Sequence, residues 1–157
     1  MSTSFPKFES EATGAPPIRL IRHGFLRVRL LRRLDALARL LDGHSFWASG
    51  RSKAQLMDMI RGSQVVVSAW SGEELIGFGR ATSDGVFRAV LWDVVVAKTQ
   101  QGYGIGGRIV DVLLASPAVA KAERVYLMTT TGEGFYEKLG FKRVVSQQLM
   151  LKQLQTE

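Results

Sequence analysis

A glycine-rich stretch, QQGYGIGG at residues 100–107, most constrains how this chain can fold. It follows an almost wholly apolar run at residues 91–96 and precedes a stretch whose apolar residues recur at helical spacing as far as Leu113. The segment 124–130 then has the pattern of a strand. A strand, a tight turn, a helix and another strand make a right-handed crossover, so we predict that the two strands are parallel.

The chain before this crossover alternates with a period of two, which predicts antiparallel strands separated by short turns at Ser71-Gly72 and Asp84-Gly85. The predicted fold is therefore α/β (α+β): a mixed, mostly antiparallel sheet with one parallel crossover and helices on both faces. The predicted strands are 65–70, 75–81, 86–97, 124–130 and 141–151, and the predicted helices are 26–41, 52–60, 105–115 and 133–139.

The length of 157 residues, of which 46% are hydrophobic, predicts one globular domain. We assign residues 18–157 to it and residues 1–17, rich in Ser, Thr, Gly and Pro, to a disordered tail. The tail has no apolar stretch like that of a signal peptide, and no run is long enough to cross a membrane, so we expect a cytoplasmic protein without a membrane partner. The chain has no cysteine and two histidines, which excludes a cysteine nucleophile and argues against a metal site.

Positive charge is concentrated near the start of the predicted domain. The chain carries a net charge of +7, and residues 18–39 alone contain seven arginines and one acidic residue. The simplest interpretation is the solvated face of one amphipathic helix; the alternative is a contact with an acidic partner or RNA. Because a nucleic-acid groove would spread its charge over the domain, we do not expect nucleic acid to be the main partner.

The glycine turn has the composition of a phosphate site, because backbone N–H groups converge at a helix start and glycines let a phosphate approach them. The glycines are Gly102, Gly104, Gly106 and Gly107. Three of them satisfy the dinucleotide pattern G-x-G-x-x-G, but that motif normally opens a parallel, doubly wound sheet. An antiparallel meander precedes it here, which argues against a dinucleotide-binding module.

Another pattern fits this context better. Val94-Val95-Val96, four linking residues and Gln101-x-x-Gly104-x-Gly106 resemble the acyl-CoA signature of the GNAT acetyltransferases. The later segment GFYEKLGF, at 134–141, resembles the late helix and strand of the same family. The segments GFGRATSDG, WDVVV and ERVYLMTT are similar to a cyanobacterial and plastid branch, whose plastid members are known as serotonin N-acetyltransferases, some of which also acetylate protein amines.

The resemblance implies acetyl-CoA as acetyl donor and no metal. It places the pantetheine arm between two splayed parallel strands, along Val94–Val96, and the pyrophosphate on the backbone from Gln101 through Gly102, Tyr103, Gly104, Ile105 and Gly106 to Gly107. It makes Tyr136 the donor that protonates the departing thiolate; the alternative is a core tyrosine, since Phe135, Leu139 and Phe141 surround it with apolar groups. The family often has asparagine where this chain has Thr129, so the resemblance leaves that contact with CoA in question.

Three further residues are singled out by their setting. Asp93 is the one acid in an apolar strand end, so it is either a general base or a buried carboxylate bonded to backbone or to an arginine. Phe46 and Trp47 lie in the loop that the resemblance places beside the acceptor amine. They either form an aromatic wall for an arylalkylamine or cap the core beneath that loop.

Together these features predict a GNAT-type N-acetyltransferase that transfers acetyl directly from acetyl-CoA to a primary amine, with serotonin or another arylalkylamine as the expected acceptor. The alternatives are a protein lysine or N-terminal acetyltransferase, and a non-catalytic acyl-CoA-binding regulator that uses its basic segment on RNA or protein. The sequence leaves homodimerisation open.

Overall fold

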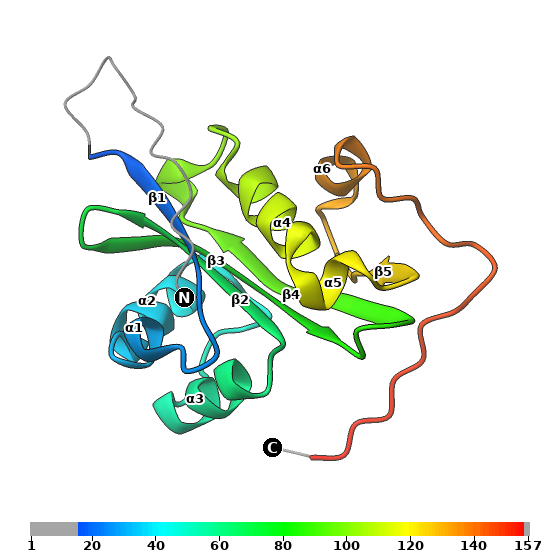
Figure 1. Ribbon diagram of the computed structural model, residues 1–157, viewed down its shortest axis with the longest axis horizontal. Helices are drawn as coiled ribbons and strands as arrows, with labels where there is room; N and C mark the ends of the chain where they lie inside the picture. The colour runs from blue at the N-terminus through cyan, green and yellow to red at the C-terminus, as the bar shows by residue number, and fades with distance from the viewer. Residues whose placement is uncertain (1–15, 156–157) are drawn as a thin grey trace.

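The computed structural model describes residues 16–155 and contains one five-stranded sheet with the order β1-β2-β3-β4-β5 (Figure 1). The first four strands are antiparallel neighbours, and β4 and β5 are parallel. The strands are β1 Ile18–Arg22, β2 Val65–Ser71, β3 Glu74–Ser83, β4 Arg88–Val96 and β5 Arg124–Tyr126. The predicted mixed sheet with one parallel crossover is thus confirmed.

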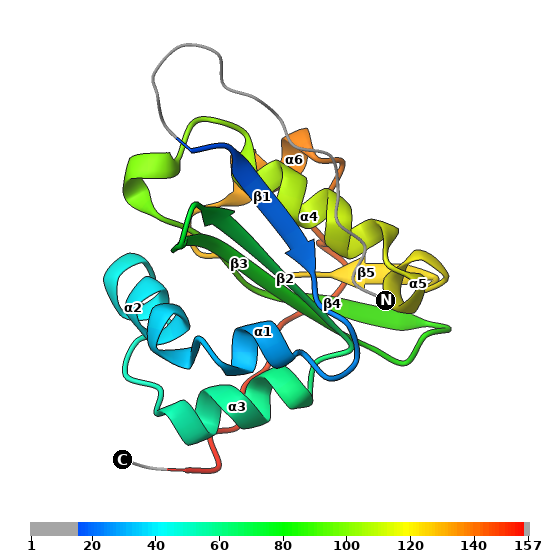
Figure 2. The same ribbon diagram turned by 60° about the vertical axis from the view of Figure 1, so that its left-hand side comes forward.

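Helices cover both faces of the sheet, as Figures 1 and 2 show. On one face, α2 packs on β3 and β4 and contacts α1 and α3; on the other, α4 packs on β2, β3 and β4. The helices are α1 Val28–Leu31, α2 Leu34–His44, α3 Lys53–Arg61, α4 Ile105–Ala115, α5 Pro117–Ala120 and α6 Glu133–Lys138. Within residues 16–155, no helix combines the length and the apolar character needed to cross a membrane.

The arginine-rich segment differs from its prediction. Instead of one helix over 26–41, it contains β1, a loop, α1 and α2. The left-handed backbone of Arg27 (φ 50°) delays the helix start to Val28, and the buried Arg27 guanidinium donates to the carbonyl oxygens of Phe25 and Ser63. The helix is then interrupted at Arg33, whose backbone (φ −123°, ψ 37°) is not helical, so α1 and α2 are separate. The positive charge is therefore spread over a strand, a loop and two helices rather than over one helix face. The proposed tail lies almost wholly outside the described residues.

Two glycines in β3 allow α4 to lie close against the sheet. A Cβ at Gly77 would come within 2.8 Å of Ile109, and one at Gly79 within 2.7 Å of Ile109 and 3.1 Å of Leu113. The side chains of Ile109 and Leu113, both in α4, are fully buried. Because α4 begins at the glycine turn, this close contact also fixes where that turn lies relative to β4.

The predicted final strand over 141–151 is wrong: the structure has no strand after β5 within the described residues. Strand β5 is also shorter than predicted, ending at Tyr126 rather than at residue 130. A segment with a period of two becomes a strand only when a neighbouring edge supplies hydrogen bonds. Residues 142–155 run as an exposed chain that leaves α6 and passes around the outside of β5 (Figure 1).

Candidate active site

The candidate site begins where β4 and β5 part. These parallel strands pair over only three positions, Arg88–Val90 with Arg124–Tyr126. Strand β4 continues for six more residues, through Val94, Val95 and Val96, beside no paired part of β5. Its backbone groups on that side are therefore free to bind an extended ligand in the manner of an added strand.

A β-bulge lies in the part of β4 that has no partner in β5. The register with β3 runs from Phe78 opposite Val95 to Arg80 opposite Trp92, so β4 contains one extra residue. Asp93 lies within the bulge and has a left-handed backbone (φ 52°), which is rare for a non-glycine residue. The bulge redirects the β4 backbone just before Val94–Val96.

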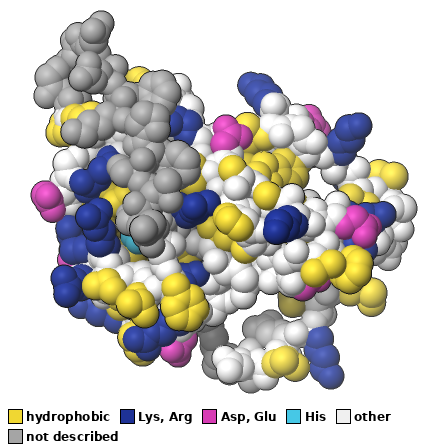
Figure 3. All heavy atoms as spheres, viewed as in Figure 1, with side chains coloured by type: hydrophobic (Ala, Val, Ile, Leu, Met, Phe, Trp, Pro, Cys, Tyr) yellow, Lys and Arg dark blue, Asp and Glu magenta, His cyan; other side chains and the backbone are white. Residues whose placement is uncertain are grey.

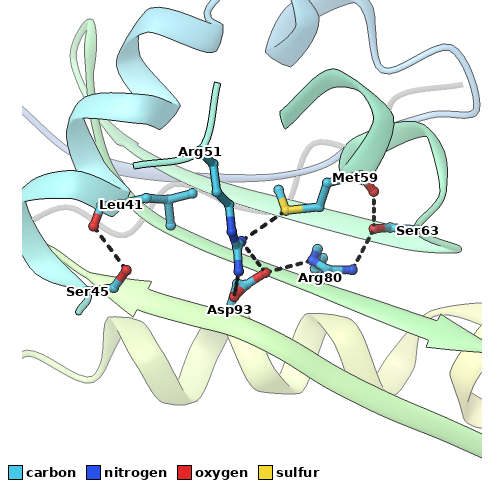
Figure 4. A network of polar contacts seen from close by, with 7 residues as sticks. All are labelled: Leu41, Ser45, Arg51, Met59, Ser63, Arg80 and Asp93. Carbon is cyan, nitrogen blue, oxygen red and sulfur yellow. Dashed lines mark hydrogen bonds and ion pairs between the residues drawn. The ribbon is translucent and has the colours of Figure 1, made fainter. Parts of the chain in front are cut away.

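The Asp93 carboxylate is held by two arginines (Figure 4). Arg51, two residues before α3, donates from Nη1 to Oδ2 at 2.9 Å and from Nη2 to Oδ1 at 3.3 Å. Arg80 of β3 donates from Nε to Oδ2 at 2.8 Å. These bonds tie the bulge both to the neighbouring strand and to the loop that precedes α3.

The same contacts determine the charge state of Asp93. Burial alone would raise the pKa of this carboxyl, but the hydrogen bonds from Arg51 and Arg80 outweigh burial and hold the pKa below its ordinary value. A carboxylate with a lowered pKa and both oxygens bonded to arginines is a weak proton acceptor. The arrangement favours the second alternative for Asp93, a buried carboxylate paired with arginine.

The turn after β4 leads into α4 with its first glycines facing open space. Gly102 and Gly104 have left-handed backbones (φ 86° and 80°), and nothing lies within 4 Å of a Cβ built on either. Gln101 donates from Nε2 to the carbonyl oxygen of Val96 at 3.0 Å, which fixes the turn to the end of β4. Tyr103 is exposed, whereas Ile105 is buried and anchors the helix start.

The other two glycines of the turn face protein. A Cβ at Gly106 would come within 3.1 Å of the Phe135 ring, and one at Gly107 within 3.6 Å of Leu139. The contact at Gly106 is tight, so its small size admits the Phe135 ring of α6, whereas the distance at Gly107 is an ordinary van der Waals contact. The backbone N–H groups at the first turn of α4 still have no partner inside the helix, so they can donate to an anion.

Helix α6 brings Tyr136 beside this region. Its half-buried ring packs edge-to-face against Phe135 (centroids 4.8 Å apart) and Phe141 (5.8 Å). Burial raises the pKa of the Tyr136 phenol, so it stays protonated near neutral pH and can donate a proton. The Thr129 hydroxyl accepts from the N–H of Gly132, the residue before α6, at 2.8 Å. Thr129 thus also has a structural role at the start of this helix.

The loop between α2 and α3 carries the two aromatic residues. Phe46 and Trp47 are 71% and 50% exposed and pack edge-to-face with centroids 5.1 Å apart. They do not cap the core, which the loop reaches through Ala48 instead. His44 accepts at Nδ1 from the N–H of Lys98 at 3.1 Å, and this bond joins the loop to the chain just after β4.

Sequence reasoning missed Arg51, Arg80 and His44, the residues that join separate elements around β4. Arg51 and Arg80 lie 42 and 13 positions from Asp93. No local pattern identifies either of them. The available signal was Asp93 itself, because an acid in an apolar strand requires a partner.

Comparison with known proteins accords with this geometry. The family profile described as "Acetyltransferase (GNAT) domain" matches residues 62–143, more than half of the chain. The chain belongs to the GNAT acetyltransferase family. The matched region contains β2 to β5, the bulge, the glycine turn and α6 of this GNAT protein.

This chain spans between about two fifths and two thirds of the length of the similar curated N-acetyltransferases named ycf52 or ycf52-like. An uncharacterized N-acetyltransferase, ycf52-like, from Prochlorococcus marinus is 31% identical over 74% of this chain and 66% of its own. Two uncharacterized N-acetyltransferases, ycf52 from Pyropia yezoensis and ycf52 from Porphyra purpurea, are matched over 50% and 41% of their own lengths. A chloroplastic serotonin N-acetyltransferase 2 from Oryza sativa is 40% identical over 42% of this chain and 34% of its own.

Solved structures agree on the fold. A GNAT-family acetyltransferase from Streptococcus pneumoniae aligns with a TM-score of 0.71 at 19% identity, covering 88% of this chain and 99% of its own. An acetyltransferase described as belonging to the GNAT family from Xanthomonas campestris aligns with a TM-score of 0.67 at 24% identity, covering 90% and 96%. At these identities the likeness establishes the shared architecture.

Proposed function

We propose that this protein is an acetyl-CoA-dependent N-acetyltransferase that transfers the acetyl group directly to a primary amine. The observation that carries the proposal is the unpaired, bulged end of β4 leading into an open glycine turn. An extended thioester with a pyrophosphate needs both features together: a free strand edge for its amide groups and converging N–H groups for its phosphates.

The donor substrate would lie along β4. Its pantetheine amides would pair with backbone groups of Val94 and Val96, and an N–H of Val94 or Val95 would polarise the thioester carbonyl. The pyrophosphate would lie at the glycine turn, against the backbone of Gly102–Gly104 and the first turn of α4. Gly106 and Gly107 would contribute their N–H groups, and Gly106 would also make room for the Phe135 ring of α6.

Two residues would then have distinct roles in the transfer. The neutral amine attacks the thioester carbonyl, the C–S bond of the tetrahedral intermediate breaks, and the departing thiolate takes a proton from the Tyr136 phenol. The nitrogen, which carries a surplus proton after the attack, gives that proton to the resulting phenolate, so Tyr136 is restored and the products are the amide and the free thiol. Asp93 would act as a positioning residue: by pairing with Arg51 and Arg80, it holds the bulge that aims the N–H groups of Val94 and Val95. This role replaces the general-base role considered from the sequence.

An arylalkylamine is the acceptor class that the exposed aromatic pair supports. Phe46 and Trp47 offer ring faces and edges to an aromatic amine, and two contacts hold their loop near the end of β4, from Arg51 to Asp93 and from His44 to Lys98. The name of the rice relative, a serotonin N-acetyltransferase, supports the same class.

Protein amines are the second candidate acceptor. A relative from Glycine max that is 35% identical over 45% of this chain is named a histone acetyltransferase. The arginine-rich segment 18–39 would favour an acidic protein surface over a free cationic amine. Kinetics with both classes of acceptor distinguish the two candidates.

Calorimetric titration with acetyl-CoA, followed by measurement of thiol release, tests the proposal. We expect binding in the micromolar range and thiol release that requires an added amine. Absence of binding at tens of micromolar would refute an acyl-CoA site. Binding without amine-dependent release, over serotonin, polyamines and lysine peptides, would instead identify a non-catalytic acyl-CoA-binding regulator.

A further inference from the structure

The loop between β1 and α1 displays large apolar side chains that the proposed function leaves unexplained. Phe25 and Leu26 are 91% and 70% exposed, and Val28, the first residue of α1, is 43% exposed. We call these three side chains the apolar tip. The tip lies at the opposite end of the sheet from the glycine turn (Figures 1 and 2). Neighbouring apolar side chains exposed to this extent often mark a binding surface.

The protein holds the apolar tip in place from beneath. The buried guanidinium of Arg27 donates to the carbonyl oxygen of Phe25 at 2.8 Å and to that of Ser63, which precedes β2. The N–H of Arg27 donates to the carbonyl oxygen of Gly24 at 3.0 Å. A left-handed backbone is costly for an arginine and persists only where surrounding contacts impose it. The loop is therefore fixed with Phe25 and Leu26 pointing outward.

Exposed arginines lie next to the apolar tip. Residues 18–33 contain six arginines and no acidic residue. Arg29 lines the same shallow hollow as the three side chains of the tip. Arg32 lies one helical turn after Val28, whose carbonyl oxygen accepts from the Arg32 N–H at 3.1 Å. Because Arg29 and Arg32 are both exposed, their charges can reach a partner that covers the tip.

The effect of these charges is visible at His23, the residue after β1. Its pKa is lowered to about 4, first by burial and then by the positive charges of Arg27 and Arg29. Figure 3 shows hydrophobic side chains with Lys and Arg around them at the lower left, where the loop between β1 and α1 lies in Figure 1. Exposed apolar groups within a positive surface are complementary to a partner that is anionic outside and apolar beneath.

We infer that the apolar tip attaches the protein to the surface of an anionic lipid bilayer. Phe25 and Leu26 would enter the boundary between headgroups and acyl chains, and Arg29 and Arg32 would contact lipid phosphates. The tip exposes roughly 300 Å² of apolar surface, less than the ~800 Å² per partner of a stable protein interface, whereas a bilayer needs no matching shape. The sequence-based expectation of no membrane partner rested on the absence of a spanning run, and surface attachment requires none.

Co-sedimentation with vesicles tests the attachment, and no readout depends on acetyltransferase activity. The protein should sediment with phosphatidylcholine vesicles that contain phosphatidylglycerol and much less with phosphatidylcholine alone. Arg29→Gln/Arg32→Gln should weaken binding about 20-fold, since each arginine contributes roughly fivefold. The matched control Lys142→Gln/Arg143→Gln removes the same charge from another exposed segment and should bind nearly as the parent does. Absence of binding to the anionic vesicles, or equal losses in both variants, would overturn the inference.

Substitutions in the apolar tip distinguish insertion from a purely electrostatic contact. Phe25→Ser/Leu26→Ser keeps the charge and the backbone hydrogen bonds, so it should stay folded by circular dichroism and bind the anionic vesicles more weakly by about 10-fold or more. The control Val86→Ser/Phe87→Ser removes apolar side chains that are 56% and 58% exposed near the turn between β3 and β4, and it should bind like the parent. Unchanged binding of the Phe25→Ser/Leu26→Ser variant would contradict insertion.

A fluorophore shows directly whether the tip enters the bilayer. The chain has no cysteine, so Leu26→Cys and Val86→Cys each provide a single labelling site. The emission of an environment-sensitive dye at position 26 should shift to the blue when anionic vesicles are added, and that of a dye at position 86 should not. An unshifted dye at position 26 in a protein that still sediments would overturn the inference. Binding to polyglutamate without binding to vesicles would also overturn it and would assign the arginines to an acidic protein partner.

Discussion

The two sides of β4 show what close packing and open space each contribute to this fold. On the side of β3, helix α4 lies so close to the sheet that Ile109 and Leu113 occupy the space that a Cβ would need at Gly77 or Gly79. Both α4 side chains are fully buried there. Toward β5, β4 has no partner beyond Val90. We call β3 and α4 the packed region. The open region consists of β4 beyond Val90, the glycine turn that follows it and the neighbouring helix α6.

Glycine occurs in both regions for opposite reasons. In the packed region it is needed because a neighbouring side chain occupies the space of a Cβ. At Gly102 and Gly104, in the open region, the space is empty and the left-handed backbone is what requires glycine. Substitutions in the packed region should therefore change stability, and substitutions in the open region should change binding or turnover.

The largest expected effect is in the packed region. Gly79→Val would force a side chain against Ile109 and Leu113, and we expect a loss of about 3 kcal/mol in the free energy of unfolding. That loss corresponds to a melting temperature lower by about 10 °C, measured by calorimetry or circular dichroism. Gly134→Ala, in α6 with no atom near its Cβ, is the control and should leave the melting temperature almost unchanged. Equal effects of the two variants would contradict the packing argument.

Among substitutions in the open region, Tyr136→Phe should cause the largest loss of turnover. If the phenol protonates the thiolate, turnover should fall by roughly 10²-fold while acetyl-CoA affinity and melting temperature stay near those of the parent. Because burial raises the pKa of Tyr136, loss of turnover through its ionisation should occur only above about pH 10. Tyr103→Phe, at an exposed position, should have no such effect. Unchanged turnover in Tyr136→Phe would assign the ring to packing alone.

Asp93 lies on the border between the regions, so its variant should affect both stability and rate. Asp93→Asn replaces a charged acceptor of the Arg51 and Arg80 hydrogen bonds, and we expect a cost of about 2 kcal/mol in unfolding free energy at pH 7. The pKa of Asp93 is lowered in the folded state, so its contribution is present above about pH 4 and is lost as pH falls through the folded-state pKa. The stability gap between parent and variant should therefore shrink in acid.

The rate profile of the same variant distinguishes positioning from base catalysis. A positioning role predicts that turnover falls by a similar factor at every pH where the protein is folded. A general-base role predicts the greatest loss at low pH, where the amine holds its proton most tightly. A loss confined to low pH would return Asp93 to the role of base.

Gly104→Val tests the open region through its backbone. The affinity for acetyl-CoA should fall by 10-fold or more, because a β-branched residue resists the left-handed conformation that aims the turn. Gly85→Val is a closely matched control: Gly85 has φ 79° and equally open surroundings but lies in the turn between β3 and β4. Both variants should lose similar stability, and only Gly104→Val should lose affinity. Equal affinities would remove the glycine turn from the donor site.

The smallest effect is expected at the acceptor. Trp47→Ala should raise the Michaelis constant for serotonin about fivefold, which corresponds to ~1 kcal/mol of ring contact, with little change for acetyl-CoA. Phe25→Ala removes another exposed ring, before α1, and serves as the control. If lysine peptides have much higher specificity constants than serotonin and are equally affected by Trp47→Ala, protein amines become the favoured acceptor.

The sequence predicted the parts of the fold that local patterns encode. The period of two, the Asp84-Gly85 turn and the glycine-rich helix start were sufficient to predict β2 to β4, α4 and the parallel crossover. The motifs also identified the chain's family and placed Tyr136 in a helix and the glycines at the start of α4. These features depend on residues close together in the chain, so a linear pattern records them.

Tertiary structure decided whatever depends on residues far apart in the chain. A period of two gave Phe141–Leu151 the pattern of a strand, but a strand also needs a free edge beside it, and no local pattern states where that edge lies. Asp93 required a partner from its sequence context alone, yet only the folded sheet brings Arg51 and Arg80 to its carboxylate. In the sequence the four glycines of the turn look alike, and only the folded chain shows that Gly102 and Gly104 have left-handed backbones while Gly106 makes room for the Phe135 ring of α6. Hydrogen-bond partners and excluded volume belong to pairs of distant residues, which is why they appear only once the chain is folded.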